Sequence, residues 1–246
     1  MEELEHSLFI VEFINKIFSK PLAALFGLLG IPVTHPESMI PDYIIMSLIV
    51  AVILALFFGL SARKLSPVPT RMQSFLEMII KIFEGQLADT VGEEGKKYAP
   101  MIATVGLFIF TCNMLGLIPG FMSPTSKINV TAACALTVFL YYHWQGIKVQ
   151  GIFKYLKSFA GPIPALAPLM IPIELISHFS RVVSLSIRLF GNIFAEELLI
   201  VVIGSIIPFL LPLPFMAISI FTAIIQSFVF VLLSCIYISG AVAQEH

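Results

Sequence analysis

Charged residues are scarce in this chain of 246 residues. Asp, Glu, Lys and Arg make up 12% of the sequence and apolar residues 58%, whereas soluble domains carry about 25% charged residues. This composition excludes an ordinary soluble domain and predicts an integral membrane protein. The formal net charge of −1 gives no reason to expect nucleic acid as a partner.

Cysteine is scarce as well. Cys112, Cys134 and Cys235 stand singly in apolar segments and lack the spacing of metal ligands. We interpret all three as small packing residues and expect no disulfide, no metal site and no cofactor. The chain begins with acidic MEELEH where a secretory signal would be basic, so we expect no cleaved targeting segment.

Long apolar runs are the main feature that is present. A transmembrane helix needs roughly 20 apolar residues, and residues 43–62 are uncharged throughout. Further spans are predicted at 101–122 and 130–144, the second of which is short unless neighbouring residues extend it. After a proline-rich stretch, residues 172–202 and 206–240 predict a long helical hairpin. We therefore predict an all-α membrane protein, a single integral membrane domain (1–246) with five transmembrane helices.

Two further segments are amphipathic rather than uniformly apolar. In residues 67–97, apolar side chains recur at intervals of three and four while polar ones take the other side, which predicts a helix on the cytoplasmic membrane surface. Residues 1–40 are apolar but are interrupted by Glu12, Lys16, Lys20 and Pro21. An interfacial helix suits this segment better than a span.

Basic residues orient the predicted bundle. Short loops that are rich in Lys and Arg stay on the cytoplasmic side. One side of the bundle carries Arg63, Lys64, Arg71, Lys81, Lys96, Lys97, Lys148, Lys154 and Lys157, and the other only Lys16, Lys20 and Lys127. With five crossings, this predicts an N-terminus outside the cell and a C-terminus in the cytoplasm.

Two arginines lie inside the predicted hairpin and need an explanation. An arginine at mid-bilayer costs from about 2.5 to more than 10 kcal/mol, so it is kept where it faces a partner or water. Glu174, Arg181 and Arg188 are seven residues apart and fall on one helical stripe. His178, Ser184 and Asn192 lie on the same stripe. Glu196 lies near it, whereas Glu197 points to almost the opposite side.

Structural explanations compete with functional ones on this stripe. Arg181 is close to the predicted cytoplasmic end, so snorkelling towards lipid headgroups explains it as well as function does. His178 alone is weak support for a site, and Glu174 could simply cap the helix start. Arg188 is surrounded by apolar residues and is too far from either end for easy escape, which favours a functional role.

The motif SLSIRLFGNIFAEEL and the final segment IIQSFVFVLLSCIYISGAVAQEH resemble subunit a of the rotary F-type ATP synthases. This subunit is the membrane stator beside the rotating ring of c subunits. LGLIPG, PTSKINVTAACAL and the order of spans fit too, so the resemblance covers nearly the whole chain. It implies a bacterial or plastid-type member, in a bacterial inner membrane or alternatively a thylakoid membrane. Implied partners are the c-ring, the peripheral-stalk b subunits, the remaining synthase subunits and the lipid bilayer.

The resemblance also implies roles for residues. Arg188 matches the family's essential arginine, which faces the c-subunit carboxylate, and Gln226 matches a glutamine near it. Asn192 and Glu197 match residues of the half-channel open to the outside, whereas Glu174 and Ser184 match positions near the cytoplasmic half-channel. His178 and Arg181 are secondary candidates. The chain has no nucleotide-binding loop, so it is not expected to be an enzyme by itself and ATP chemistry belongs to other subunits.

The chain departs from the family pattern at two positions. Ser219 stands where some members have a histidine, and Glu196 stands where glycine is frequent. The two changes compensate each other if an ionisable group has moved from one helix to its neighbour. The outer relay would then use a pair of adjacent carboxylates.

Two other functions fit part of the sequence. A proton- or sodium-coupled transporter would also place charged residues at mid-bilayer, but internal repeats are typical of transporters and we find no convincing one. A structural scaffold would not place an arginine among apolar residues.

Overall fold

Helices make up the regular structure of the described residues. The computed structural model describes residues 40–62, 66, 69–118, 121–159, 161, 166–206 and 212–242. Within them, the elements are α2 (Asp42–Ala62), α3 (Arg71–Val91), η2 (Glu93–Tyr98), α4 (Ala99–Leu115), η3 (Pro124–Ser126), α5 (Ile128–Gln150), α6 (Ile152–Ser158), α7 (Ala167–Ile206) and α8 (Pro212–Val242). The predicted interfacial segment 1–40, Arg63, Lys64 and the last four residues lie outside this description, apart from Ile40.

Four helices of the described part are long and apolar enough to cross a membrane. They are α2, the continuous stretch from Glu93 to Leu115, α7 and α8. α5 is not one of the four, although its 23 residues exceed the range predicted from the sequence at both ends. The class of all-α membrane protein is therefore confirmed, whereas the count of five spans remains a prediction.

α3 is an amphipathic helix with defined ends. The Oγ1 atom of Thr70 accepts a hydrogen bond from the backbone N–H of Gln73 at 3.3 Å, which caps the N-terminus. Leu76 and Leu87 are its buried residues. At the other end Gly92 has φ of +96°, a conformation that glycine adopts without steric penalty, and the chain turns there into η2. The range predicted as one helix is thus divided in two.

α7 begins five residues before the predicted boundary at Pro172. It starts at Ala167 and runs for 40 residues with Pro172 inside it. Pro168 lies in the first turn, where a missing N–H is tolerated, and Pro172 removes one further donor close to that end. At about 1.5 Å per residue the helix is about 60 Å long, twice the thickness of a bilayer core.

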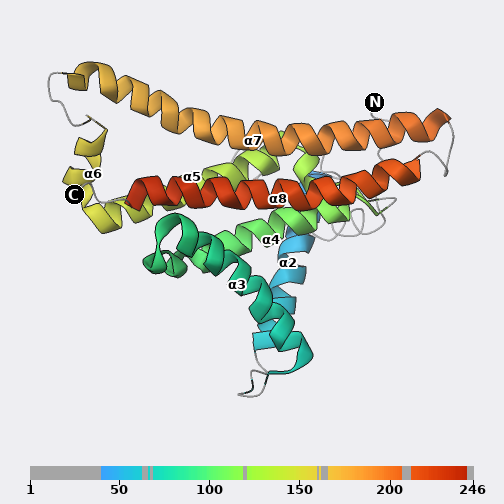
Figure 1. The fold of residues 1–246 in the computed structure, drawn as a ribbon. Coiled ribbons are helices and arrows are strands. Elements are labelled where there is room, and N and C mark those ends of the chain that lie inside the picture. The colour runs from blue at the N-terminus through green and yellow to red at the C-terminus, as the bar shows by residue number, and fades with distance from the viewer. Residues whose placement is uncertain are drawn as a thin grey trace, which may run out of the picture.

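α7 and α8 form an antiparallel pair along one side of the molecule (Figure 1). A Cβ atom added at Gly204 would lie 3.6 Å from Pro212, so the end of α7 lies close to the start of α8. Farther along, Asn192 bonds to Gln226, and Arg181 lies over the ring of Tyr237. The residue numbers rise on one helix as they fall on the other, as an antiparallel pair requires.

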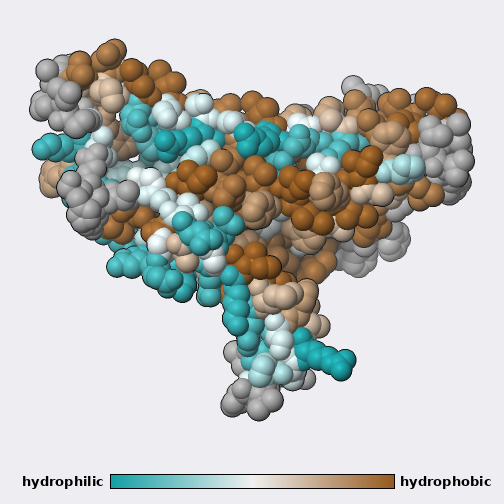
Figure 2. All heavy atoms as spheres, in the orientation of Figure 1, coloured by the Kyte–Doolittle hydropathy of each residue, from teal (hydrophilic) through white to brown (hydrophobic). Residues whose placement is uncertain are grey.

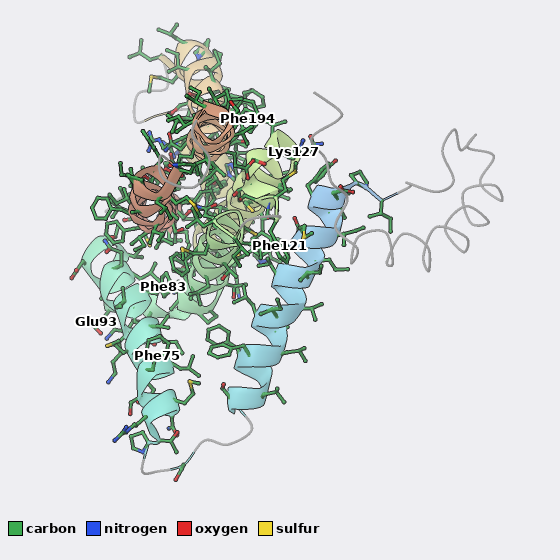
Figure 3. The ribbon with its side chains drawn as sticks, turned by 90° about the vertical axis from the view of Figure 1, so that its right-hand side faces the viewer. Phe75, Phe83, Glu93, Phe121, Lys127 and Phe194 are labelled. Carbon is green, nitrogen blue, oxygen red and sulfur yellow. The ribbon has the colours of Figure 1, made fainter. Side chains whose placement is uncertain are left out.

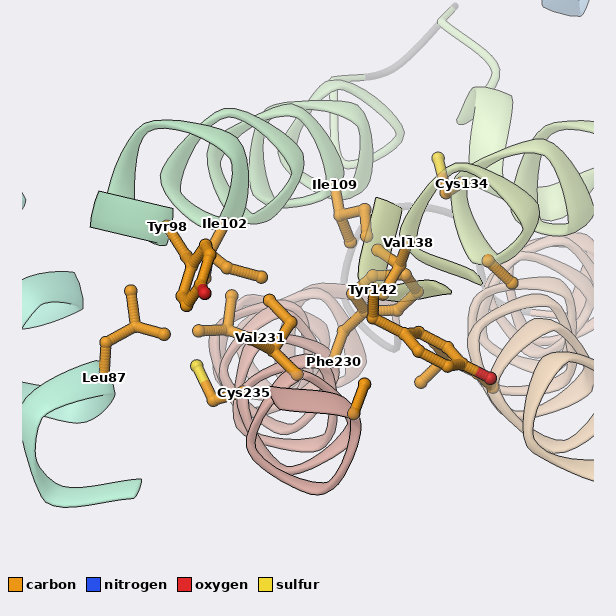
Figure 4. Close-up of a cluster of buried hydrophobic side chains, with 14 of the residues drawn as sticks. Leu87, Tyr98, Ile102, Ile109, Cys134, Val138, Tyr142, Phe230, Val231 and Cys235 are labelled. Atoms are coloured by element: carbon orange, nitrogen blue, oxygen red, sulfur yellow. The ribbon is translucent and has the colours of Figure 1, made fainter. Parts of the chain in front are cut away.

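The hydrophobic core surrounds α8, which packs against α3, α4, α5 and α7. Figure 4 shows side chains from α3, α4, α5 and α8 pointing toward one another. Phe230 and Val231 of α8 meet Ile102 and Ile109 of α4 there. The core holds Cys134 and Cys235, and Cys112 is likewise buried with a free thiol, in agreement with a packing role.

α2 packs loosely against this body. Figure 3 shows α2 and α3 extending from it as two separate arms. The buried residues of α2 are Ile45, Met46 and Val50, near its start, where Ile45 and Met46 contact Leu115 and Phe121. Most of the remaining apolar side chains of α2 are exposed, which suits a helix surrounded by lipid.

Candidate functional site

The predicted site residues lie along α7 and on the facing side of α8. In Figure 2 hydrophilic side chains form a band along α7 beside α8, in surroundings that are mostly apolar. The predicted stripe is not uniform in the structure. Its middle is exposed, whereas its two ends are covered by different parts of the chain. We call the end near Glu196 and Glu197 the η3 end, and the end near Glu174 and His178 the α6 end.

Arg188 lies in the exposed middle of α7, together with Ser184 and Asn192. Its neighbour Ile187 is also exposed, whereas Leu185 and Leu189 turn into the core. Among the described residues, Arg188 makes no ion pair or hydrogen bond with another side chain. The guanidinium therefore points away from the protein body, on the side of the molecule that the core does not use.

A polar pair lies one helical turn from Arg188. The Nδ2 atom of Asn192 donates a hydrogen bond to Oε1 of Gln226 at 2.8 Å. Gln226 is only 4% exposed, and the neighbouring Ser227 is also buried. The two residues predicted on separate helices are thus brought together. Their bond fixes the amide of Gln226 beside the turn that carries Arg188.

At the η3 end the two adjacent carboxylates face different elements. Glu196 turns to α8, where Ser219 and Thr222 lie nearby without a hydrogen bond to it; the Thr222 hydroxyl donates to the backbone oxygen of Ile218 at 3.1 Å. The structure thus brings Glu196 and Ser219 together, the two positions at which the chain departs from the family pattern. Thr222 was not singled out from the sequence, although it lies three residues after Ser219 and hence on the same helix face.

Glu197 turns to the connection between α4 and α5. Its Oε1 accepts a hydrogen bond from the backbone N–H of Ser123 at 2.9 Å. Ser126 and Lys127 also lie close enough to act on this carboxylate. The contact between Glu197 and the loop around PTSKIN was not predicted. Ser123 is 74 positions away from Glu197, so the local sequence gives no signal of their hydrogen bond.

A buried network of polar groups supports this loop. The Oγ of Ser123 donates to the backbone oxygen of Cys112 at 3.0 Å and also lies 2.7 Å from Oγ1 of Thr125. Thr125 in turn donates to Oδ1 of Asn113 at 2.6 Å. Gly116 permits the close approach, because a Cβ atom there would lie 2.6 Å from Cβ of Ser123 and 3.3 Å from Oε1 of Glu197. The absence of a side chain at Gly116 therefore sets the position of the Glu197 carboxylate.

At the α6 end the stripe is covered by aromatic side chains. His178 is 9% exposed, and its Nδ1 lies 2.9 Å from the hydroxyl of Tyr142 on α5. Its Nε2 lies 3.3 Å from Oε1 of Glu174, one turn earlier on α7. His143 of α5 stacks close by and is bonded through Nδ1 to the hydroxyl of Tyr155 on α6. Neither Tyr142 nor His143 was identified from the sequence.

Arg181 lies between this cluster and α8. Its guanidinium carbon is 5.3 Å from the centre of the Tyr237 ring, a cation–π contact. Arg181 is partly buried, so the structure places it in a contact between α7 and α8. From the sequence, snorkelling was considered for this residue and an aromatic partner was not.

The fold and this site define a class of protein: an all-helical membrane protein with a long antiparallel helix pair that carries an exposed arginine between two clusters of titratable side chains. The model of the family described as ATP synthase A chain matches residues 44–239. The chain is 42% identical to "ATP synthase subunit a 1" of Pelobacter propionicus over 98% of its length and 99% of that relative. It is 43% identical, over the same shares, to "ATP synthase subunit a" of Geobacter sulfurreducens.

A further relative, "ATP synthase subunit a 3" of Pelobacter propionicus, is 48% identical over 81% of this chain and 86% of that protein. The chain belongs to the ATP synthase subunit a family. The resemblance identified from the RLFGN segment is therefore confirmed.

Proposed function

We propose that this chain is the ion-translocating stator subunit of a rotary F-type ATP synthase. The proposal is supported by the similarity to subunit a proteins over nearly the whole chain and by the exposed Arg188 on α7. The single observation that carries it is Arg188, a permanent cation on the uncovered side of a membrane helix. The subunit has no catalytic role of its own, and it acts in proton transport and ATP synthesis as part of the complex.

The proposed partner of Arg188 is the carboxylate of a passing c subunit. A guanidinium stays charged at any relevant pH, and a nearby opposite charge favours the ionised form of a carboxyl group. A protonated ring carboxyl must therefore release its proton before it passes Arg188. The same positive charge repels protons, so they cannot cross directly from one half-channel to the other.

The two ends of α7 are the proposed half-channels. The η3 end, with Asn192, Glu196, Glu197 and Ser219, would open to the outside, and the α6 end, with Glu174 and Ser184, to the cytoplasm. The proximity of Glu196 to Ser219 supports an outer relay that includes both adjacent carboxylates. Gln226 keeps the polar surface beside Arg188 in place. Each proton that descends the membrane potential supplies about 2.3 kcal/mol per 100 mV, and offset channels convert this energy into ring rotation.

The proposal includes a topology. With α5 as the fifth span, the N-terminus lies outside and the C-terminus in the cytoplasm. The 23 residues of α5 extend about 34 Å, enough to cross a bilayer core of about 30 Å. The uncovered side of α7 and α8 would face the c-ring, and the b subunits of the peripheral stalk would bind elsewhere on this subunit. Because the most similar relatives reported above are bacterial, we place the complex in a bacterial inner membrane.

The deciding experiment replaces Arg188 in the assembled synthase. We expect Arg188→Ala to abolish ATP-driven acidification of inverted vesicles, because ring carboxyl groups would then pass without releasing protons. Wild type and variant are compared at matched levels of assembled complex. Normal pumping by the variant would refute the proposed role. A transporter would act without a ring, so binding of the purified chain to a c-ring separates that alternative from the proposal.

A further inference from the structure

The cluster at the α6 end contains a histidine that the proposed mechanism does not use. His178 is hydrogen-bonded at Nδ1 to the hydroxyl of Tyr142, and its Nε2 lies 3.3 Å from Oε1 of Glu174. Glu174 is a proposed residue of the cytoplasmic half-channel. We propose that His178 is a positioning residue for Glu174: it fixes the carboxylate and sets the cytoplasmic pH range in which Glu174 exchanges protons. This inference rests on the proposed function and goes beyond it.

The hydrogen-bond geometry defines the protonation states of the cluster. A neutral imidazole has one donor and one acceptor nitrogen. If the Tyr142 hydroxyl donates to Nδ1, then the imidazole hydrogen is on Nε2, which lies 3.3 Å from Oε1 of Glu174 and faces the carboxylate without forming a hydrogen bond to it. A charged imidazole would instead donate at both nitrogens, and the buried hydroxyl hydrogen of Tyr142 would lose its acceptor. Leaving such a group unpaired costs about 1–3 kcal/mol.

The surroundings favour the same states. Three residues face His178 directly, namely Tyr142 and His143 of α5 and Arg181 of α7. Two more lie behind them: Tyr155 of α6 next to His143, and Tyr237 of α8 next to Tyr142. Arg181 is the permanent cation among them. It repels a second positive charge at this position.

The cluster is closed at its inner side, which argues for positioning rather than conduction. Tyr142 is 1% exposed, and the rings of His143 and Phe159 cover His178. Glu174 is 36% exposed at its side chain and thus remains open to arriving protons. A proton that moved from Glu174 through His178 to Tyr142 would enter the packed core. Glu174 therefore exchanges protons on its exposed side while His178 holds it from the buried side.

The test measures ATP-driven acidification of inverted vesicles as a function of bath pH, because the bath then replaces the cytoplasm. Rates are compared at matched levels of assembled complex. His178→Leu removes the imidazole N–H that faces the carboxylate, so we expect the midpoint of the profile to move to higher pH by about one unit. His178→Gln retains an amide donor and is expected to restore part of the shift.

Matched variants separate positioning from packing. His143→Leu removes a ring from the same stack but no partner of Glu174, so its midpoint should equal that of wild type. In a chain that already carries Glu174→Gln, adding His178→Leu should leave the midpoint of the pH profile unchanged. If His178→Leu prevents assembly, Tyr142→Phe keeps the ring and releases Nδ1, and we expect a smaller shift in the same direction.

Three results would overturn the inference: an unmoved midpoint in the His178 and Tyr142 variants, an equal shift in His143→Leu, or an undiminished effect of His178→Leu in the Glu174→Gln chain. The proposed function fails separately, through retained pumping in Arg188→Ala. If the pH profile of the His178 variants does not move and Arg188→Ala loses pumping, the positioning role is refuted and the proposed function stands.

Discussion

The two ends of α7 hold their carboxylates in different ways. At the η3 end, Glu197 accepts a hydrogen bond from a backbone amide and Glu196 faces hydroxyl groups of α8. At the α6 end, Glu174 faces the imidazole of His178, which aromatic rings cover. A backbone amide always donates, whereas a neutral imidazole donates from only one of its two nitrogens. The carboxylate of Glu197 therefore has a fixed hydrogen-bond donor, whereas that of Glu174 faces a ring whose polarity depends on its tautomer.

The middle of α7 differs from both ends because no other element in the described part of the chain covers it. Arg188 is exposed there, and the nearest polar pair, Asn192 with Gln226, lies one turn away. A covered arginine would be compensated within the chain, whereas an exposed one is available to a separate molecule. This difference makes Arg188→Ala the most severe of the expected changes.

The carboxylates of the η3 end give the next largest effect. We expect Glu196→Gln and Glu197→Gln each to reduce ATP-driven proton pumping, and the double variant to lose on the order of 10²-fold, since glutamine cannot exchange a proton. The rate of vesicle acidification at matched assembly measures this. Normal pumping in both single variants would mean that protons take another route and that the two ends do not share a function.

A pair of glycines tests how each end is held in place. A Cβ atom at Gly116 would lie 2.6 Å from Cβ of Ser123, an atom fixed to the backbone that positions Glu197. A Cβ atom at Gly146 would lie 2.5 Å from the buried ring of Tyr155, whose hydroxyl is bonded to His143, and 3.0 Å from the backbone oxygen of Ala241. We expect Gly116→Ala and Gly146→Ala each to destabilise the subunit by about 1–3 kcal/mol.

The thermal midpoint of the assembled complex and the pumping rate measure both glycine variants. Gly85→Ala is the matched control, because nothing lies within 4 Å of the added atom. Gly116→Ala should also slow pumping through the displaced Ser123 amide. Equal values for Gly116→Ala and Gly85→Ala would show that the loop adapts without disturbing Glu197.

The smallest effect is expected at Arg181. A lysine ammonium can also lie over the Tyr237 ring, and exposed cation–π contacts contribute only about 0.5–1 kcal/mol. Arg181→Lys should therefore pump at close to the wild-type rate over the same pH range. An inactive Arg181→Lys protein would show that the α6 end needs the planar guanidinium.

Much of the helical framework could be predicted from local pattern. The uncharged run of α2 and the periodicity of α3 both appear in the structure as helices close to the predicted bounds. The start of α7 was predicted too late, because Pro172 was taken as a boundary although a proline near a helix start removes only one donor. The opposite directions of Glu196 and Glu197 follow from helix geometry, but the identity of their partners does not.

The sequence by itself determined that this protein is helical and membrane-embedded, that an arginine lies within an apolar helix, and that the chain belongs to the subunit a family. Apolar composition and helical periodicity are properties of short stretches of sequence, so both can be recognised without the structure. Only the tertiary structure decided which part of the polar stripe is covered. Ser123 bonds to Glu197 across 74 positions and Tyr142 to His178 across 36, and such pairs form only when the packing of the core brings their helices together.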